Sequence, residues 1–537
     1  MQERKSHPIQ TRSVLFTVSA LTLILGAGMV CAIVVGVIRG DALSDLRGFL
    51  ASAGGCLGAC LVCAGLSRLP WGINRVRSSM RYGFSTISLA WGSSILLGAL
   101  PFTLCCGLHP IDALFETASG LSTTGATILQ PGIPLLNGEV LADGLAGLPQ
   151  AILFWRQLLI WFGGIGFVMF ALLLLPALGG GRQLYNAEVP GMKSIYDQMM
   201  PRIASTARVI LGCYVLWTLL VTLAYKLAGM DSLYDAICHA FATVATGGFS
   251  PYPENFQHFP QPAVQWVCIA AMLFSSLNLV LMARLLLKHQ FVYHKDEETR
   301  TFLCLFLALT AFFAYRLHSA STAQLTSLDG TPIAHDWHSL LRTAAFHVSA
   351  LMSSTGFTTA DFSQWTMVPG LGILVLMMSL VGGCGGSTSG GMKLGRVIVM
   401  LKHGVSEVRR RIFPHLVPNV LLNGKRLDMP SVNQCTAFFA LYMATIAGST
   451  LLLAFLCPAN TPLESLLSAV VSCVSNAGPG LGEVSPTHTF ALFSSPAKLL
   501  MAFDMIAGRL ELYTAFVILL PSFWGRAASP KGFGIRN

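Results

Sequence analysis

Long apolar stretches separated by short polar segments recur along the whole chain. Ten of them approach or exceed about 20 residues, the length that crosses about 30 Å of hydrocarbon at ~1.5 Å per residue. They cover residues 13–38, 48–69, 83–104, 151–178, 207–229, 263–287, 301–317, 369–400, 433–457 and 497–522. The first is too long for the apolar core of a signal peptide and lacks a small-residue cleavage site. The pattern therefore predicts an all-α polytopic membrane protein with ten transmembrane helices.

Four shorter segments between these stretches read as variants of one template of 14 columns. They are DALFETASGLSTTG (112–125), DAICHAFATVATGG (235–248), TAAFHVSALMSSTG (343–356) and SLLSAVVSCVSNAG (465–478). The first column holds Asp, Asp, Thr and Ser, residues that cap helix N-termini, and the last column is always Gly. Each template predicts a capped helix with about 10 apolar or small residues, too short to span a bilayer and therefore re-entrant. In the second copy either Gly247 or Gly248 fits the last column, and Gly248 is favoured because Gly248-Phe249-Ser250 then matches Gly356-Phe357-Thr358.

Four such segments around one axis would present a ring of backbone carbonyls to a dehydrated ion. Glycine permits the positive φ that turns successive carbonyls the same way, and each short helix points the negative end of its dipole at the centre. The alternative is that these small residues serve close helix packing. Four copies that match in their capping, aliphatic and glycine columns favour the ion-binding interpretation.

The template divides the chain into repeats with the order helix, template, helix. The template glycines are 123, 108 and 122 residues apart, too far for a solenoid of 20–50-residue units. We expect an N-terminal two-helix addition over 1–82 and four repeats over 83–205, 206–299, 300–430 and 431–537. The predicted architecture is thus four helix–re-entrant loop–helix units in pseudo-fourfold arrangement plus two N-terminal helices.

Composition and charge support a membrane protein and give its orientation. The chain is 53% hydrophobic and 11% charged, with a mean hydropathy of +0.64. Its net charge of +10 lies in alternate loops, with eight basic residues in 393–426 alone. The loops that hold the templates contain a single basic residue, Arg342. Basic loops mark the cytoplasmic side, so both termini are expected inside. This placement explains the basic charge by orientation in the lipid membrane, and we expect no nucleic-acid partner.

A glycine-rich loop, GGCGGSTSGGMK (382–393), interrupts the eighth apolar stretch. It lacks the Gly-Lys-Ser/Thr ending of a phosphate loop and the βαβ context of a dinucleotide site. We interpret it as an intramembrane gate; the alternative is a packing kink. The candidate gate residues are Gly382, Gly383, Gly385, Gly386, Ser387, Thr388, Gly390, Gly391 and Lys393.

Several ionisable residues lie inside apolar segments, where such residues usually face a cavity and find partners. Arg509 would put a positive charge in the inner pore near the gate; the alternative is a salt bridge with Glu511 or Asp504. Arg156 would brace the outer end of the template ring. His239 and His347 share the fifth template column and are interpreted as neutral core residues. No spacing suggests a metal centre of His, Cys and Asp, and no nucleophile–base set suggests an enzyme.

Together these residues resemble the Trk/Ktr/HKT superfamily of potassium transporters, and within it the membrane subunits of bacterial Trk systems (TrkH/TrkG type). The resemblance spans about 83–526, and the two extra N-terminal helices match the Trk branch. The motifs that carry it are SGLSTTGAT (119–127), WRQLLIWFGGIGF (155–167), LYNAEVPG (184–191), PRIASTA (201–207), ATGGFS (245–250), STGFTTADFS (354–363), GGCGGSTSGGMK (382–393), NAGPGLG (476–482) and GRLELYT (508–514).

The resemblance implies which residues bind and gate the ion. It places a potassium filter at Ser122, Thr123, Thr124, Gly125, Thr246, Gly247, Gly248, Ser354, Thr355, Gly356, Asn476, Ala477 and Gly478. The potassium-binding oxygens would come from Thr123, Thr124, Thr246, Gly247, Ser354, Thr355, Asn476 and Ala477. Glycine in all four filter strands implies potassium preference, whereas Ser in the first strand accompanies sodium selectivity in the family. The gate maps onto Gly382–Gly391 and the pore arginine onto Arg509.

The resemblance also implies partners and location. It predicts a homodimer in the bacterial inner membrane that rests on a cytosolic nucleotide-binding regulatory subunit of the TrkA type. The nucleotide, NAD or ATP, would bind that partner, and this chain would carry K⁺ as substrate and no covalent cofactor. Segment 402–426 is a candidate docking surface, although orientation signalling explains its charge equally well.

The sequence thus predicts potassium uptake driven inward by the membrane potential, ~2.3 kcal/mol per charge per 100 mV. Coupling to protons or sodium, as in symport, is left open. One rival is a secondary carrier that couples cation and small-solute transport, which would need substrate-sized polar groups at broken helices. A second rival is a sensor or scaffold that transports nothing.

Overall fold

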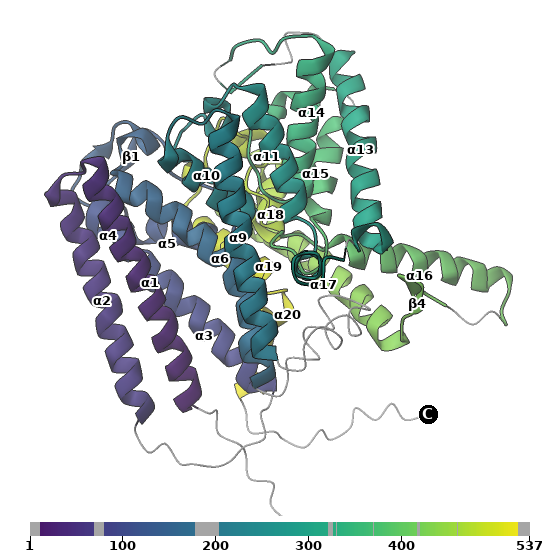
Figure 1. Cartoon of the computed structure of the whole chain (residues 1–537), viewed down its shortest axis with the longest axis horizontal. Coiled ribbons are helices and arrows are strands. Elements are labelled where there is room, and N and C mark those ends of the chain that lie inside the picture. The colour runs from purple at the N-terminus through teal and green to yellow at the C-terminus, as the bar shows by residue number, and fades with distance from the viewer. Residues whose placement is uncertain are drawn as a thin grey trace, which may run out of the picture.

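The computed structural model is almost entirely helical (Figure 1). It describes residues 11–68, 80–177, 203–290, 292–319, 326–328, 330–368, 370–415, 419–458 and 460–524. The motif at 184–191, the start of the motif at 201–207, and Arg75, Arg77, Arg182, Lys193 and Arg202 lie outside these residues.

The helices of the N-terminal half are α1 (Thr11–Arg39), α2 (Leu43–Arg68), α3 (Met80–Gly98), α4 (Leu100–Cys106), α5 (Pro110–Leu121), α6 (Gln150–Ala177), α9 (Ile203–Ala228), α10 (Leu233–Val244), α11 (Pro262–Ser275) and α12 (Leu279–Lys288). Those of the C-terminal half are α13 (Glu297–His318), α14 (Trp337–Met352), α15 (Leu371–Val381), α16 (Leu394–Ile412), α17 (Met429–Leu456), α18 (Leu463–Ser475), α19 (Ser495–Arg509), α20 (Tyr513–Leu519) and α21 (Pro521–Trp524). Two small antiparallel hairpins, β1 (Ile133–Pro134) with β2 (Val140–Leu141) and β3 (Leu421–Leu422) with β4 (Lys425–Arg426), lie in loops.

Six helices in the described part of the chain are long and apolar enough to cross a membrane. They are Val14–Arg39, Leu46–Arg68, Phe84–Cys106, Arg208–Ala228, Glu297–His318 and Met429–Leu456. A seventh span is possible if α11 and α12, which meet at a bend of 99°, count as one. The stretches expected at 369–400 and 497–522 are likewise interrupted, the first by residues 382–393 and the second by 510–512. The protein is therefore a multi-pass membrane protein, and the count of ten spans stays a prediction.

Two groups of helices lie on opposite sides of the molecule (Figure 1). The antiparallel pair α1 and α2 packs against α3, α4 and α6 on the N-terminal side of the molecule. On the other side α11, α13, α14 and α15 stand side by side, and α16 extends sideways from them with the β3–β4 hairpin beside it.

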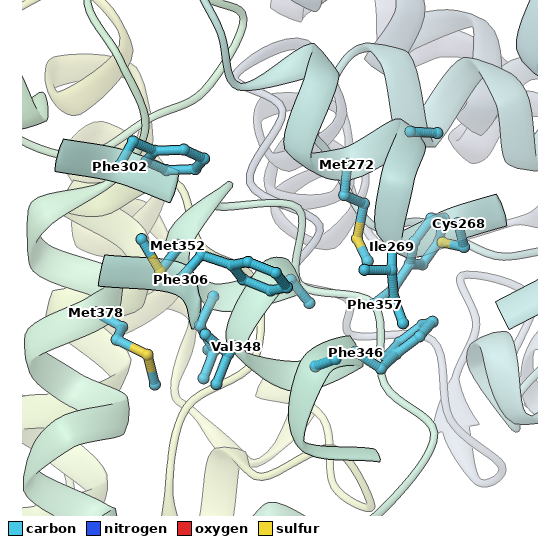
Figure 2. Packing of buried hydrophobic residues seen from close by; sticks show 14 of the residues in the cluster. Cys268, Ile269, Met272, Phe302, Phe306, Phe346, Val348, Met352, Phe357 and Met378 are labelled. Atoms are coloured by element: carbon cyan, nitrogen blue, oxygen red, sulfur yellow. The ribbon is translucent and has the colours of Figure 1, made fainter. Parts of the chain in front are cut away.

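A large apolar core fixes the third template segment between these helices (Figure 2). Figure 2 shows Cys268, Ile269 and Met272 of α11 and Phe302 and Phe306 of α13 facing side chains of α14. Phe357, which directly follows the template glycine Gly356, is fully buried among them, and its ring lies 5.1 Å from that of Phe256. Burial of an aromatic side chain contributes about 1.5–3 kcal/mol, so this contact anchors the chain immediately after the template.

The template helices α5, α10, α14 and α18 have 12, 12, 16 and 13 residues, too few to span. The predicted caps are wrong. The actual N-cap residues are His109, Ser232, Asp336 and Pro462, so each helix begins before the first template column. In α5 the reason is Pro110, whose fixed φ suits the first helical position. Column one falls inside the helix, where Asp112 and Asp235 lie in the first turn and favour the positive end of the dipole.

Candidate functional site

The four template helices end in the same backbone turn. Column 12 has a positive φ in every copy: 57° at Thr123, 54° at Thr246, 54° at Ser354 and 53° at Asn476. The amide of column 13 donates to the carbonyl of column 8 at 2.9 Å in all four copies, from Thr124 to Ser119, Gly247 to Ala242, Thr355 to Ala350 and Ala477 to Ser472. These bonds are those of a Schellman motif, which reverses the chain at a helix C-terminus. Such a φ is strained for threonine, so four repetitions mark a conformation that the surroundings impose.

The template glycines close a ring. Their φ angles are 82°, 70°, 75° and 90° at Gly125, Gly248, Gly356 and Gly478. A Cβ on each would lie against the column-13 carbonyl oxygen of the next copy. These distances are 2.2 Å from Gly125 to Gly247, 2.0 Å from Gly248 to Thr355, 2.3 Å from Gly356 to Ala477 and 2.8 Å from Gly478 to Thr124. The contacts run in the order one, two, three, four and back to one. They also identify Gly248, not Gly247, as the equivalent glycine.

All the residues predicted for the filter are thereby brought together in these four turns, and all are buried or nearly so. The hydroxyls of columns 11 and 13 bond at 2.6 Å in two copies, Ser122 with Thr124 and Ser353 with Thr355. Asn476 joins the fourth copy to the first by donating to Thr124 Oγ1 at 2.9 Å. Thr123 Oγ1 and Asn476 Oδ1 are buried oxygens with no hydrogen-bond partner. Buried polar oxygens of this kind call for a water molecule or an ion as partner.

The glycine-rich loop, residues 382–393, contacts the helical end of three template turns. Thr388 Oγ1 donates to Val244 O at 2.9 Å, Gly390 N to Ser354 Oγ at 2.6 Å, and Gly391 N to Ser475 O at 2.8 Å. Gly390 has no room for a side chain, because a Cβ there would lie 2.2 Å from Ser475 O. Within the loop Lys393 is buried and its ammonium group donates to Ser389 O. The loop is thus packed directly beneath columns 10–12.

Arg509 links this loop to the remaining repeat. Its guanidinium donates to Thr388 O at 2.7 Å and to Gly163 O at 3.1 Å. The alternative salt bridges considered from the sequence do not form with either acid. Glu511 pairs with Arg396 at 2.6 Å, and Asp504 accepts a hydrogen bond from Ser449. Arg509 therefore lies against the glycine-rich loop, and its role in a pore stays a prediction.

Arg156 lies at the opposite end of the ring, as the sequence suggested. It forms a buried ion pair with Glu116 at 2.7 Å and donates to Ser250 O at 3.1 Å. Its guanidinium also lies 4.0 Å from the centre of the Phe249 ring. Glu116 was not identified from the sequence, although it occupies the same fifth column as His239 and His347.

A second residue that sequence reasoning missed is Glu298, at the start of α13. One carboxylate oxygen accepts hydrogen bonds from Gly385 N at 2.8 Å and Gly395 N at 2.7 Å. Gly385 lies near the start of the loop, and Gly395 lies two residues beyond its end. The preceding Glu297 binds Lys402 of α16 and the amide of Asn423 in the β3–β4 hairpin. The only sequence signal was the run Asp296-Glu297-Glu298 at the edge of an apolar stretch. Its meaning depends on the tertiary position of the loop.

The arrangement offers oxygen ligands without fixed negative charge. Four helix C-termini, each equivalent to about −0.5 charge, end three or four residues before the template glycines of the ring. Among the described residues no group of three or more His, Cys, Asp or Glu could hold a metal ion. Backbone carbonyls and hydroxyls suit a monovalent cation that has shed its water.

These features define the class: a multi-pass helical membrane protein in which four equivalent re-entrant-length helices converge on one ring of carbonyls. The family model of TrkH, described as a cation transport protein, matches residues 59–524. The chain therefore belongs to the TrkH family, as its motifs predicted. This membership confirms the predicted transporter in place of an enzyme, because its relatives are named as transport proteins.

The individual relatives cover most of the chain. The Trk system potassium uptake protein TrkH of Halomonas elongata is 35% identical over 524 residues, 96% of this chain and 99% of that protein. TrkH of Vibrio parahaemolyticus is 34% identical over 86% of this chain and 90% of its own, and TrkG of Escherichia coli is 30% identical over 83% and 85%. The crystal structure of the potassium transporter TrkH from Vibrio parahaemolyticus matches with a TM-score of 0.79 at 30% identity, over 96% of this chain and 99% of that one.

Glu298→Ala should loosen the glycine-rich loop, because it leaves the amides of Gly385 and Gly395 buried without an acceptor. Each unsatisfied amide costs about 1–3 kcal/mol. Hydrogen–deuterium exchange of a peptide over 382–395 should rise in the variant. Glu297→Ala is the matched control, since its carboxylate binds Lys402 and Asn423 and not the loop; unchanged exchange in Glu298→Ala would contradict this role.

Proposed function

We propose that this chain takes up potassium ions across the bacterial inner membrane through the ring formed by its four template turns. The observation that supports this most strongly is the cyclic contact of each template glycine with the column-13 carbonyl of the next copy. A ring of carbonyls and hydroxyls replaces the hydration shell of an ion without binding it as tightly as carboxylates would. The relatives named potassium uptake proteins favour K⁺ as the substrate.

In this proposal the four turns are a selectivity filter and the binding oxygens are those of columns 12 and 13. They come from Thr123, Thr124, Thr246, Gly247, Ser354, Thr355, Asn476 and Ala477. The four helix–re-entrant loop–helix repeats and the two N-terminal helices give ten membrane crossings, with both termini in the cytoplasm. The alternation of basic and non-basic loops supports this orientation.

The glycine-rich loop and Arg509 form the gate in this proposal. The support is their set of contacts with all four repeats on the helical side of the ring. A cation leaving the filter would meet this loop and the positive charge of Arg509. Movement of the loop would have to break the bond from Arg509 to Thr388, which therefore holds the pore in one state.

Regulation would come from partners outside the membrane. We propose a homodimer and a cytosolic nucleotide-binding subunit that binds α16 and the hairpin after it. Leu401, Val405, Val408 and Ile412 of α16 are exposed and share one helix face beside Arg409–Arg411. An exposed apolar stripe flanked by positive charge is typical of a docking surface. Through Lys402 and Glu297 this segment is connected to the helix that holds the gate.

Gly125→Ser should weaken discrimination against sodium. Its Cβ would lie 2.2 Å from Gly247 O, so that carbonyl must shift away from the ion. In reconstituted liposomes the ratio of potassium to sodium flux should fall about tenfold, equivalent to about 1.4 kcal/mol. Gly478→Ala should have a smaller effect, because its Cβ would approach Thr124 O only to 2.8 Å.

Gly132→Ala is the matched control for this test. Gly132 has a φ of 87°, similar to that of Gly125, but a Cβ there would meet nothing within 4 Å. It therefore carries the backbone strain without the clash and should leave the flux ratio unchanged. Wild-type selectivity in Gly125→Ser would refute the filter. Absence of any cation flux in the wild type with its partners would favour a scaffold, and flux that depends on an organic solute would favour a secondary carrier.

Shortening residues 384–390 or making Arg509→Gln should raise the basal potassium flux. A charge-assisted hydrogen bond is worth about 1.5–3 kcal/mol, so its loss should raise the open fraction at least about tenfold. Rubidium uptake without the regulatory subunit measures this. Lys226→Gln removes a charge of α9 whose ammonium group donates to Asp231 O in an exposed contact, and it should leave the basal flux unchanged. A basal flux that stays level or falls in both gate variants would contradict the gate.

A further inference from the structure

In three of the four copies the side chain of the fifth template column holds the chain that follows the template glycine. We call columns 15–17 the exit segments: residues 126–128, 249–251, 357–359 and 479–481. Column 5 is Glu116, His239, His347 and Ala469 in the four copies. The first three side chains are fully buried and each bonds to its own exit segment.

In the first copy Glu116 accepts from Ile128 N at 3.2 Å and from Thr127 Oγ1 at 3.0 Å. Its pair with Arg156 at 2.7 Å extends this contact to the second copy, because Arg156 also donates to Ser250 O at 3.1 Å. Thr127 and Ser250 both occupy column 16. One guanidinium therefore holds equivalent positions of two neighbouring exit segments.

In the second and third copies a histidine occupies column 5, and each histidine contacts only the exit segment of its own copy. His239 Nε2 lies 3.2 Å from Ser250 Oγ, and His347 Nε2 accepts from Thr359 N at 3.4 Å. In both rings Nδ1 faces the carbonyl four residues earlier, at 2.8 Å for His239 and 2.9 Å for His347. Because a carbonyl only accepts, Nδ1 carries the hydrogen, and Nε2 of His347 is free to accept from the backbone.

The fourth copy has Ala469 in column 5, which cannot form a hydrogen bond with its side chain. The preceding residue, Ser468, holds the exit segment instead. Ser468 Oγ accepts from Leu481 N at 2.9 Å and donates to Leu481 O at 3.1 Å. All four exit segments are thus held at column 16 or 17 by a polar side chain from column 4 or 5 of the template. Only the first two are held to each other by an ion pair.

We propose that column 5 is a positioning column for the ring and that the buried Glu116–Arg156 pair sets cation discrimination by fixing the first and second exit segments together. This inference rests on the proposed function. The template glycine lies only two residues before column 16, so a shift of the exit segment moves the carbonyls on each side of the glycine. A site that distinguishes ions of similar size depends on where those oxygens are held. Glu116 and Arg156 act through the backbone and do not contact the ion.

The pair offers a test that separates positioning from charge. Arg156 uses all three nitrogens of its guanidinium: Nε and Nη2 contact Glu116, Nη2 also contacts Thr127, and Nη1 donates to Ser250 O. Lysine keeps the charge but cannot reproduce this fork of planar donors. Glu116→Gln and Arg156→Lys should therefore each lower the potassium-to-sodium flux ratio of reconstituted protein about tenfold, equivalent to about 1.4 kcal/mol. Because a ratio is measured, a smaller amount of folded protein does not alter it.

The double variant Glu116→Gln/Arg156→Lys should lower the ratio no further than either single variant, since the two residues act as one unit. Asp112→Asn is the matched control. Asp112 lies on the same helix α5 and forms an ion pair of 2.6 Å with Lys498 of α19, away from the exit segment. It should leave the ratio at the wild-type value.

A wild-type ratio in both Glu116→Gln and Arg156→Lys would overturn the inference, as would an equal loss in Asp112→Asn or independent, multiplying effects in the double variant. If Glu116→Gln yields no folded protein, Arg156→Lys decides alone, because it leaves no buried carboxylate without a cation. Failure of the proposed function gives a different result: the wild type itself would then show no potassium preference or no flux.

Discussion

The absence of a side chain at four positions is the constraint on which the rest of the structure depends. Each template glycine lies so close to a carbonyl oxygen of the next copy that a single Cβ would approach it to 2.0–2.8 Å. Backbone therefore packs on backbone around the ring, and the last template column leaves no room for a side chain. The Schellman turns and the glycine-rich loop beneath them hold the four chain segments in this close backbone contact.

The four turns are alike in backbone and unlike in side chain. The column-12 residues Thr123, Thr246, Ser354 and Asn476 share a φ within a few degrees, although threonine adopts it at a cost. Their side chains contact different partners: Thr246 Oγ1 lies near Thr388 of the loop, Ser354 accepts from Gly390, and Asn476 donates to Met505 O. The backbone thus keeps the near-fourfold ring, while the side chains adapt each copy to a single, asymmetric loop beneath it.

Much of the ring could be predicted from the sequence, because aligning the four repeats shows which positions hold the same kind of residue in every copy. The last column and the short helices were identified correctly, and the geometry resolves the ambiguity between Gly247 and Gly248. The capping column was misassigned because the true N-caps, such as Ser232 and Asp336, precede the template and vary in spacing. The role of Glu298 could not be predicted, since two amides distant in sequence define it. Glu116 could have been found, because column 5 places a carboxylate where two other copies have histidine.

The four exit segments are held by different contacts, and this difference affects how the ring would respond to movement of the glycine-rich loop. A buried ion pair joins the first and second exit segments, and breaking such a pair leaves an uncompensated charge. The third and fourth segments are held by a histidine contact of 3.4 Å and a serine, neither of which joins one copy to the next. The glycine-rich loop bonds to these same two copies through Gly390 and Gly391, and it bonds to the second copy through Thr388, which donates to Val244 O at 2.9 Å. The loop therefore supports the two copies that lack an ion pair to a neighbour, and through Thr388 it also reaches the half of the ring that the ion pair fixes.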